Sequence, residues 1–372
     1  MGNIYRDMTL ENLDESYIGK ELKVAGWVEN IRDHGGVSFI DLRDMYGVLQ
    51  VVIRDTELLK GIKKEESISV EGLMEQRDEE TYNPKIKSGT IELEAHKITT
   101  LGQVYTQLPF EIQTSKEVRE DVRLKYRYLD LRNEKVKDNI LFRSKVIAYL
   151  RQKMTEMGFV EIQTPILCAS SPEGARDYIV PSRRYKGKFY ALPQAPQQYK
   201  QLLMVSGIDK YFQIAPCFRD EDARADRSPG EFYQLDMEMA FASQEDVFSV
   251  IEEVLPPVFA KYGVYSNASK APFVRIPYLE SMDKYGTDKP DLRIDLVLTD
   301  ATELLSGCGF GPFEGQTVKA IVVDGFTATR KQIDAICADV EVATANKAYW
   351  FKVDENGEIT GGIAKFLQNI KE

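Results

Sequence analysis

The sequence predicts an α+β protein of several domains, and three stretches carry that prediction. Five short runs of alternating apolar and polar residues follow one another in the first hundred residues. Two longer alternating runs flank a charged loop within residues 211–241. From about Leu296 onward, strand-like and helix-like segments take turns. A chain of 372 residues is long enough for two or three domains, each with a core of its own.

The first hundred residues predict a small closed β-barrel, most simply an OB-fold. Turns rich in Gly and Asp separate the five runs, which read LKVAGWVENI, VSFIDLRD, GVLQVVI, SISVEGLM and TIELEAHKI. In the second run Phe39 shares a face with Asp41 and Arg43, while Ile40 takes the opposite face. A ring beside charged groups suits an unpaired RNA base, and Gln50 in the next run is placed to read a base edge. A phenylalanine partly buried under a loop is the alternative.

The middle of the chain predicts a long amphipathic helix. Residues 106–135 are rich in charge and read as a hinge that leads into this helix. Apolar residues recur at helical spacing over residues 141–157, and Gly158 stands where a helix C-cap is expected. A strand-like run over residues 159–162 follows and ends at a Thr-Pro pair. The pattern is therefore hinge, helix and short strand.

The central stretch predicts two antiparallel strands, Tyr211–Arg219 and Glu231–Phe241, joined by a long charged loop. Alternation puts the apolar residues of the second strand on a face that can be buried. The opposite face presents Phe232, Gln234, Asp236 and Glu238. An arginine, carboxylates, an amide and an aromatic ring on one surface suit a nucleotide and an ammonium group. A solvated hairpin with surface charges is the alternative.

The charge and the cysteine pattern restrict the function classes. A net charge of −11 argues against nucleic acid only superficially, because local charge decides such contacts. Residues 116–153 hold 12 Lys and Arg against 6 Asp and Glu, which suits either RNA or a mixed-charge helix face. No apolar run reaches the roughly 18 residues of a membrane span. The four cysteines are far apart, which disfavours a zinc site and predicts reduced thiols in a cytoplasmic protein.

The central stretch resembles motif 2 of the class II aminoacyl-tRNA synthetases. That motif reads F-R-x-E, then a loop with basic residues, then an aromatic residue; Phe218–Glu221 and Phe232 stand in those places. The helix and strand predicted within residues 141–162 resemble motif 1, which forms the dimer interface in the family. The resemblance is closer still to the bacterial aspartyl-tRNA synthetases and extends along essentially the whole chain. It includes the barrel sequence GWVENIRDHGGVSFIDLRDMYGVLQVVI.

The resemblance implies a ligase that uses ATP and Mg²⁺ to convert L-aspartate into aspartyl-adenylate and then transfers the aspartyl group to the 3′ end of tRNA. Such chemistry depends on positioning and charge neutralisation rather than on a protein nucleophile. The implied aspartate contacts are Glu173, Gln197, Lys200, Arg219, Gln234 and Asp236. The implied ATP contacts are Arg219, Asp220, Glu221, Ser228 and Phe232. The implied anticodon contacts are Phe39, Gln50 and Arg32, and no residue is assigned to a metal.

The resemblance also implies domain boundaries and partners. It divides the chain into an anticodon-binding OB-fold at residues 1–105, a hinge at 106–135, the N-terminal part of the class II catalytic domain at 136–295, and all or part of a bacterial insertion domain at 296–372. The expected partners are aspartate tRNA, L-aspartate and a second copy of the chain, with no membrane. Whether asparagine tRNA is charged as well is left open.

The family's motif 3, G-x-G-x-G-x-[DE]-R, is not found in the 372 residues. We therefore expect an N-terminal portion of such an enzyme, with little or no aminoacylation activity alone. A non-catalytic tRNA-binding fragment is one alternative. A related asparaginyl or lysyl ligase is another, and Lys200 argues against it, because an asparagine substrate would leave the lysine ammonium without a charge partner.

Overall fold

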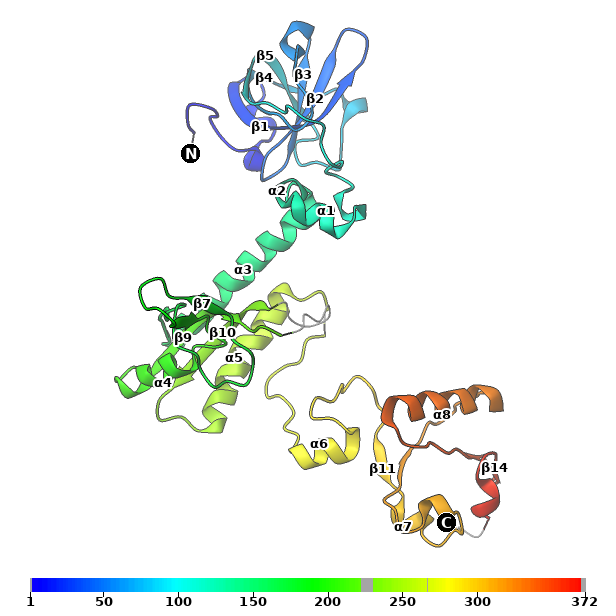
Figure 1. Ribbon diagram of the computed structural model, residues 1–372. Coiled ribbons are helices and arrows are strands. Elements are labelled where there is room, and N and C mark those ends of the chain that lie inside the picture. Colours follow the sequence, from blue (N-terminus) through cyan, green and yellow to red (C-terminus); the bar gives the residue numbers. More distant parts are fainter. Residues whose placement is uncertain (1, 222–229, 266, 369–372) are drawn as a thin grey trace. The chain divides into compact units, whose positions relative to one another are not determined.

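The computed structural model describes residues 2–221, 230–265 and 267–368. The chain forms two compact units, Met1–Lys145 and Val146–Glu372 (Figure 1). Helix α3 (Glu134–Glu156) contains the boundary between them. Within the described ranges, no helix combines the length and the apolar character that crossing a membrane requires.

The first unit contains a closed barrel of five strands. The strands are β1 (Glu21–Asp33), β2 (Ser38–Arg43), β3 (Val48–Ile53), β4 (Ser67–Gln76) and β5 (Ile91–Gly102), in the order β1-β2-β3-β5-β4. Strands β3 and β5 are parallel, and the other neighbours are antiparallel. Alternate side chains point inward and fill the core, which includes Val24, Val28, Ile40, Leu42, Val51, Ile68, Val70 and Leu93. The OB-fold prediction is confirmed.

Arg43 does not lie on an exposed charged face, contrary to the prediction. The residue is only 7% exposed, and its guanidinium donates hydrogen bonds to both carboxylate oxygens of Glu65, at 3.0 and 2.8 Å. Glu29 lies 3.4 Å away from the same guanidinium. The segment that follows the barrel covers this end of β2, since Arg132 also donates to Glu65 at 2.6 Å. Strand alternation cannot anticipate a neighbour that comes from beyond the barrel.

The predicted hinge is a folded segment with its own small core. It forms α1 (Glu120–Lys125) and α2 (Arg127–Asp130) before α3 begins, and its core comprises Phe110, Ile112 and Leu129. Asp130 is fully buried and accepts hydrogen bonds from Ser115 at 2.8 Å and from Arg123 at 3.1 Å. Part of the positive charge within residues 116–153 is therefore neutralised inside the protein.

The second unit contains a three-stranded sheet in the order β10-β9-β6. Strands β9 (Lys210–Phe218) and β10 (Glu231–Met239) are antiparallel, and β6 (Val160–Glu161) runs parallel to β9. Helix α3 and helix α5 (Gln244–Tyr262) contribute to the core behind this sheet, which comprises Met154, Phe159, Phe212 and Val254. The predicted central strand pair is confirmed.

Two smaller elements complete this part of the second unit. Helix α4 (Gln197–Val205) packs against β9 and β10, and it begins directly after Pro196. Strands β7 (Ile179–Pro181) and β8 (Phe189–Ala191) form a two-stranded hairpin of their own (Figure 1). Helix α4 brings its side chains to the polar face of the sheet. The β7–β8 hairpin forms a two-stranded sheet of its own.

The last hundred residues alternate short strands and helices, as the sequence predicts. The elements are α6 (Tyr278–Tyr285), β11 (Leu298–Asp300), α7 (Thr302–Leu305), β12 (Lys319–Ile321), α8 (Arg330–Thr344), β13 (Lys352–Val353) and β14 (Ile359–Thr360). Thr329 and Gln332 form a capping box at the start of α8. Strand β12 is shorter than the apolar run around it, because its partner β11 offers only three residues for pairing. The small core here comprises Ala301, Leu305, Ile363 and Leu367.

Candidate functional site

The pairing of β9 with β10 builds one polar face from residues of both strands. In register, Phe232 lies opposite Cys217, Gln234 lies opposite Ala215, and Asp236 lies opposite Gln213. The alternate residues of β10, Leu235 and Met237, pack against the core behind the sheet. Because side chains alternate across a strand, the apolar packing fixes which side chains of β10 face outward.

Lys200 from α4 reaches this polar face and joins two of its carboxylates. Its Nζ donates to Asp236 Oδ1 at 2.9 Å and lies 3.3 Å from Glu238 Oε2. The Lys200 and Asp236 side chains are 12% and 8% exposed. Burial lowers the pKa of Lys200, but the hydrogen bond to Asp236 and the charges of both carboxylates outweigh it, so the pKa is raised overall. The lysine is therefore positively charged throughout the physiological range.

Three polar atoms on this face lack the hydrogen bond that burial normally demands. Within the part of the chain that the structure describes, Asp236 Oδ2, Arg219 Nε and the Tyr211 hydroxyl are buried without a hydrogen-bond partner. Buried polar atoms in native proteins are nearly always bonded, so each of these atoms is a candidate contact for a bound ligand. The carboxylate oxygen accepts and suits an ammonium group; the guanidinium N–H donates and suits a phosphate or a carboxylate.

Arg219 stands at the end of β9 beside the aromatic ring of β10. Its guanidinium carbon lies 5.0 Å from the centroid of the Phe232 ring. The Arg219 backbone N–H donates to the carbonyl of Gly230 at 2.8 Å, which closes the loop between the strands. A Cβ atom at Gly230 would lie only 2.4 Å from the Tyr178 hydroxyl, so a larger residue here would displace the Tyr178 side chain. A flat ring beside a guanidinium is an arrangement that suits a nucleotide base and its phosphates.

The loop Ser170–Asp177 is held in place by a buried amide. Gln194 is 1% exposed; its Oε1 accepts from the Ala175 N–H at 3.0 Å, and its Nε2 donates to the Ala175 carbonyl at 2.9 Å. Within the loop, Glu173 is half-buried and accepts from the Ser171 hydroxyl at 3.1 Å. Sequence reasoning could not single out Gln194, because its partner lies 19 residues away in a loop without regular structure.

The remaining predicted ATP contacts lie where β9 ends. Asp220 and Glu221 are exposed, and the Asp220 backbone is bonded in both directions to Arg176 of the preceding loop, at 2.9 and 2.7 Å. Gln197 lies in the first turn of α4, half-buried and three residues before Lys200. Ser228 lies outside the described residues.

Cys217 lies among the residues that were predicted to contact the aspartate substrate. Gln234 Oε1 accepts from its thiol at 3.4 Å. Burial, and then the negative charge of Asp236, raise the pKa of the Cys217 thiol to about 11. Arg219, Glu173 and Lys200 act on the same thiol electrostatically. Five of the six predicted aspartate contacts, all except Gln197, therefore lie in one neighbourhood, around a cysteine that sequence reasoning did not single out.

A metal site made only of protein side chains is not found in the described ranges. No group of three or more His, Cys, Asp or Glu side chains is placed there to hold a metal ion. Asp236 and Glu238 are already paired with Lys200.

The predicted anticodon contacts share the outer face of the barrel. Arg32 lies opposite Phe39 in the β1–β2 register, and Arg32 Nη2 donates to Asp41 at 2.7 Å and to Gln50 Oε1 at 3.1 Å. The Gln50 amide nitrogen donates to Glu92 at 2.6 Å, so both ends of this amide are engaged. The Phe39 ring is half-buried. Sequence reasoning missed Glu92, although the alternation in TIELEAHKI puts its side chain on the other face of the strand from Leu93.

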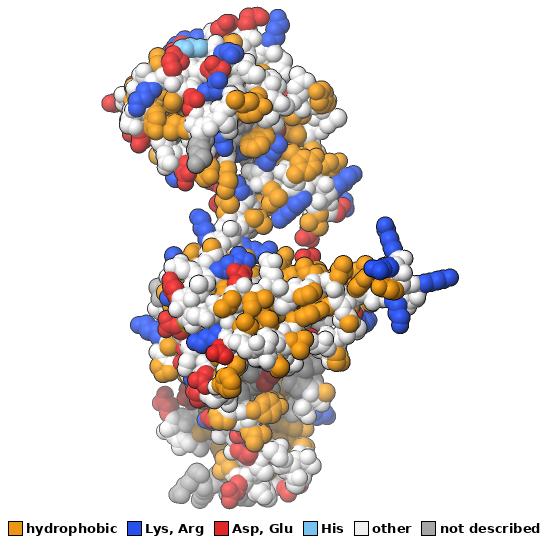
Figure 2. Space-filling model, turned by 90° about the vertical axis from the view of Figure 1, so that its left-hand side faces the viewer, with side chains coloured by type: hydrophobic (Ala, Val, Ile, Leu, Met, Phe, Trp, Pro, Cys, Tyr) orange, Lys and Arg blue, Asp and Glu red, His pale blue; other side chains and the backbone are white. Residues whose placement is uncertain are grey.

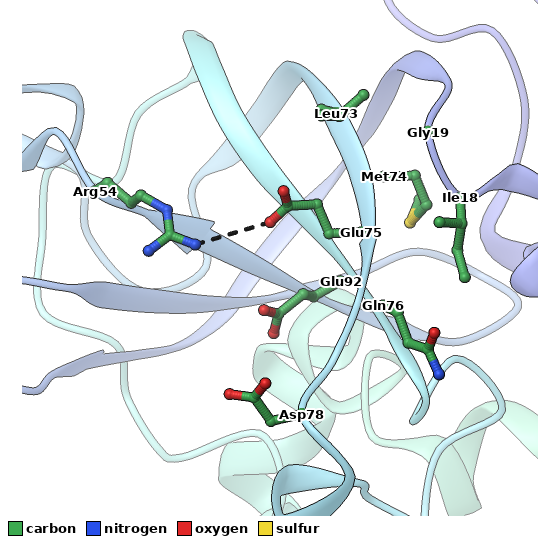
Figure 3. Close-up of a pocket in the computed structure, with 9 residues that line it drawn as sticks. All are labelled: Ile18, Gly19, Arg54, Leu73, Met74, Glu75, Gln76, Asp78 and Glu92. Atoms are coloured by element: carbon green, nitrogen blue, oxygen red, sulfur yellow. Dashed lines mark ion pairs between the residues drawn. The ribbon is translucent and has the colours of Figure 1, made fainter.

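A hollow of about 420 Å³ lies beside Glu92 on the barrel (Figure 3). Arg54, Glu75 and Asp78 line it together with Glu92, and Arg54 is paired with Glu75 at 3.8 Å. Figure 3 shows the Glu75, Glu92 and Asp78 side chains around one space. Burial raises the pKa of Glu92 despite the hydrogen bond from Gln50. Glu92 connects the charged groups of this hollow to the hydrogen-bonded side chains of Arg32, Asp41 and Gln50.

The sequence is similar to bacterial ligases along nearly its full length. It is 50% identical over 376 residues to an aspartate–tRNA ligase of Streptomyces avermitilis, which covers 99% of this chain and 64% of the relative. It is 50% identical over 374 residues to an aspartate–tRNA(Asp/Asn) ligase of Rickettsia bellii, which covers 98% of this chain and 62% of the relative. The chain thus spans less than two thirds of the length of these relatives.

The fold and the family agree with this similarity. An asparaginyl-tRNA synthetase from Pyrococcus horikoshii, complexed with asparaginyl-adenylate, superimposes with a TM-score of 0.63 at 23% identity, over 76% of this chain and 67% of that one. Residues 22–101 match the OB-fold nucleic acid binding domain. Residues 119–356, more than half of the chain, match the tRNA synthetases class II (D, K and N). The chain therefore belongs to the class II tRNA synthetases (D, K and N).

Proposed function

We propose that this chain supplies the aspartate-binding and ATP-binding face of an aspartate–tRNA ligase, an enzyme that activates L-aspartate with ATP and transfers the aspartyl group to the 3′ end of tRNA. The observation that carries this proposal is the buried network of Lys200, Asp236 and Glu238 beside Arg219. The network offers one positive and one negative binding position on the polar face of a class II sheet. The 50% identity to aspartate–tRNA ligases supports the same substrate.

The charges of the network suit L-aspartate. Asp236 Oδ2 is a buried acceptor without a partner in the described structure, and it fits the α-ammonium of an amino acid. Lys200 has three N–H donors, two of which are directed at Asp236 and Glu238. The third donor is left for the side-chain carboxylate of the substrate. An asparagine side chain would bring no charge to this ammonium, so the site favours aspartate.

Arg219 and Phe232 form the nucleotide part of the proposed site. The Phe232 ring stacks on adenine, Glu221 accepts from the adenine amine, and Asp220 lies next to the nucleotide. The Arg219 guanidinium, whose Nε–H is unpartnered in the described residues, donates to the α-phosphate and to the aspartate carboxylate, and so brings the two reactants together. Bound Mg²⁺ would supply neutralisation of the phosphate charge, with the ATP phosphates among its ligands. Glu173, Gln197 and Gln234 complete the contacts to the substrate ammonium.

The chemistry proceeds in two steps and uses no protein nucleophile. The α-carboxylate of aspartate attacks the α-phosphorus of ATP in line, so a carboxyl–phosphorus bond forms and pyrophosphate leaves. A hydroxyl of the terminal ribose of tRNA then attacks the activated carbonyl, and AMP leaves. Arg219 stabilises the charge that develops on the phosphate oxygens in the first step, because a guanidinium donates charge-assisted hydrogen bonds to such oxygens.

ATP binding distinguishes this ligase from a tRNA-binding module without chemistry. We expect calorimetric titration of the 372-residue chain with ATP to give saturable binding at a single site, because Arg219 and Phe232 are preformed. A module that only recognises RNA would bind the aspartate tRNA transcript and leave ATP unbound. That result would contradict the proposed function and support the alternative.

The outer face of the barrel is proposed to bind the anticodon of aspartate tRNA through Phe39, Gln50 and Arg32. We expect Phe39→Ala to weaken binding of an aspartate anticodon stem-loop by roughly 5- to 100-fold, since one stacked base contributes about 1–3 kcal/mol. Fluorescence anisotropy measures this affinity. Tyr105→Ala is the matched control, because Tyr105 is an 85% exposed aromatic residue of the same unit. Equal affinities of both variants would exclude Phe39 from the interface.

A homodimer is proposed through α3 and β6. Strand β6 pairs with β9 along one edge, and its Val160 side chain is 52% exposed. The unpaired backbone of an edge strand can pair with a second chain, and an exposed apolar residue there favours that contact. We expect light scattering at micromolar concentration to give twice the 42.4 kDa of one chain, and Val160→Glu to return the mass to that of one chain. A single-chain mass for the unmodified protein would exclude the dimer.

A further inference from the structure

The hairpin of β7 and β8 carries a cationic tip that the proposed active site does not use. Four of the seven residues from Ser182 to Lys188 are basic, namely Arg183, Arg184, Lys186 and Lys188, and all four are exposed. We call these seven residues the basic tip. The surrounding stretch, residues 178–208, contains no Asp or Glu at all. The whole chain has 59 acidic residues among 372 and a net charge of −11, so a stretch of this length without Asp or Glu is unusual for this chain.

The basic tip is a defined turn that holds its side chains outward. The Ser182 backbone N–H donates to the Lys188 carbonyl at 2.9 Å, and the Lys188 N–H donates to the Tyr185 carbonyl at 3.1 Å. The Tyr185 N–H donates to the Ser182 hydroxyl at 3.1 Å. Gly187 has a φ of +75°, which only glycine adopts without strain, and so allows the chain to reverse here. The four cations are therefore presented together by the backbone.

The charge of the basic tip is not neutralised by the protein. Within residues 2–221, 230–265 and 267–368, none of its four cations forms an ion pair; the one contact is that of the Arg184 guanidinium with the Tyr185 ring, at 5.4 Å. Cations elsewhere in this unit do have acidic partners: Lys284 pairs with Glu280 at 2.7 Å, and Lys319 with Asp300 at 3.0 Å. Figure 2 shows Lys and Arg side chains gathered at the end of a projection without acidic neighbours in that view.

We propose that the basic tip binds the phosphate backbone of RNA, and within the proposed function this RNA is the tRNA. Clustered Lys and Arg side chains release condensed counterions when they contact phosphates, which gives affinity without reading sequence. The two arginines offer forked donors that match phosphate oxygens, and Tyr185 adds a ring on which an unpaired base can stack. This surface is separate from Phe39, Gln50 and Arg32, and it strengthens binding rather than selecting the tRNA.

The test compares two variants with the same change in net charge. The first replaces the basic tip cations (Arg183→Gln, Arg184→Gln, Lys186→Gln and Lys188→Gln). The control replaces four other exposed cations of the same unit (Lys270→Gln, Arg330→Gln, Lys331→Gln and Lys347→Gln). Fluorescence anisotropy gives the affinity of each protein for an aspartate tRNA transcript and for an unrelated RNA duplex, between about 50 and 300 mM KCl.

We expect the tip variant to bind both RNAs at least about tenfold more weakly at low salt, and the control to bind as the unmodified chain does. The magnitude of the slope of log affinity against log salt should decrease by roughly 3 to 4 in the tip variant, since each of the four lost phosphate contacts contributes about 0.7–0.9. An unchanged slope in the tip variant would overturn the proposal. The proposal would also be overturned if the tip variant had half the mass of the unmodified protein by light scattering and the same RNA affinity. The basic tip would then bind a second copy of the chain.

Failure of this inference is distinguishable from failure of the proposed function. Calorimetric ATP binding does not involve the hairpin, so it should be equal in the unmodified chain and in both variants, and it also verifies that the variants are folded. If the unmodified chain binds ATP but neither RNA, the basic tip proposal is overturned while the nucleotide site stands. If it binds both RNAs through the basic tip but no ATP, the tip proposal stands and the ligase proposal falls.

Discussion

Lys200→Met is expected to abolish measurable L-aspartate binding and to destabilise the fold. The variant leaves Asp236 and Glu238 close together without their shared cation, and the Asp236 side chain is only 8% exposed. Breaking a buried ion pair by removing one partner typically costs about 3–5 kcal/mol of unfolding free energy. Loss of a charge-assisted hydrogen bond to the substrate carboxylate weakens binding by roughly 100-fold. Urea denaturation and calorimetry measure the two effects separately.

Lys284→Met is the matched control for the stability effect. Lys284 forms an ion pair with Glu280 at 2.7 Å, but both side chains are about half exposed, so removing the lysine should cost less than about 1 kcal/mol. Equal destabilisation of the two variants would contradict a buried role for Lys200.

The pH dependence follows from the raised pKa of Lys200. A raised pKa means that the folded state binds the proton more tightly than the unfolded state. The resulting stabilisation is complete below the ordinary lysine pKa of 10.5 and is lost as the pH rises through the folded value. The stability difference between the unmodified chain and Lys200→Met should therefore persist from neutral pH to about 10 and shrink above it.

Arg219→Ala is expected to weaken ATP binding by roughly 10- to 100-fold with little effect on stability. The guanidinium has an unpartnered buried N–H within the described residues, so the variant removes few internal contacts and about 1.5–3 kcal/mol of ligand interaction. Arg219→Lys keeps the charge but loses the planar fork, so its ATP affinity should lie between those of the unmodified chain and Arg219→Ala. Calorimetric titration with ATP measures all three proteins.

Arg275→Ala controls for the loss of an arginine beside an aromatic ring. Arg275 lies over the Phe248 ring at 4.7 Å in the same unit and is paired with Glu252, so it has no free role in the nucleotide site. We expect its ATP affinity to equal that of the unmodified chain. If Arg219→Ala also bound ATP with unchanged affinity, Arg219 would not be a phosphate contact.

Local patterns predicted the strands that present the site. The period of two in residues 231–239 assigned Phe232, Gln234 and Asp236 to one face, and the structure has the same face. The five alternating runs of the first hundred residues likewise predicted the closed barrel. Such predictions succeed because the apolar half of each strand must be buried, which fixes the direction of the polar half.

Contacts between distant segments could not be predicted in this way. The sequence interpretation assigned Lys200 and Asp236 separately to the two ends of the substrate, but the structure joins them at 2.9 Å through the docking of α4 on the sheet. Gln50 was expected to read a base edge, and Glu92 engages its amide through the parallel pairing of β3 and β5. Arg43 is buried by a segment from beyond the barrel. Periodicity within one strand carries no information about such partners.

The central claim is that Lys200 and Asp236 form a site for aspartate, and selectivity between two amino acids tests it most directly. The measurement is calorimetric titration of the 372-residue chain with L-aspartate and, separately, with L-asparagine, which has nearly the same shape but an uncharged side chain. The account predicts at least about 100-fold tighter binding of L-aspartate, because only its side chain completes the Lys200 network. Equal affinity for the two amino acids, or tighter binding of L-asparagine, would contradict it.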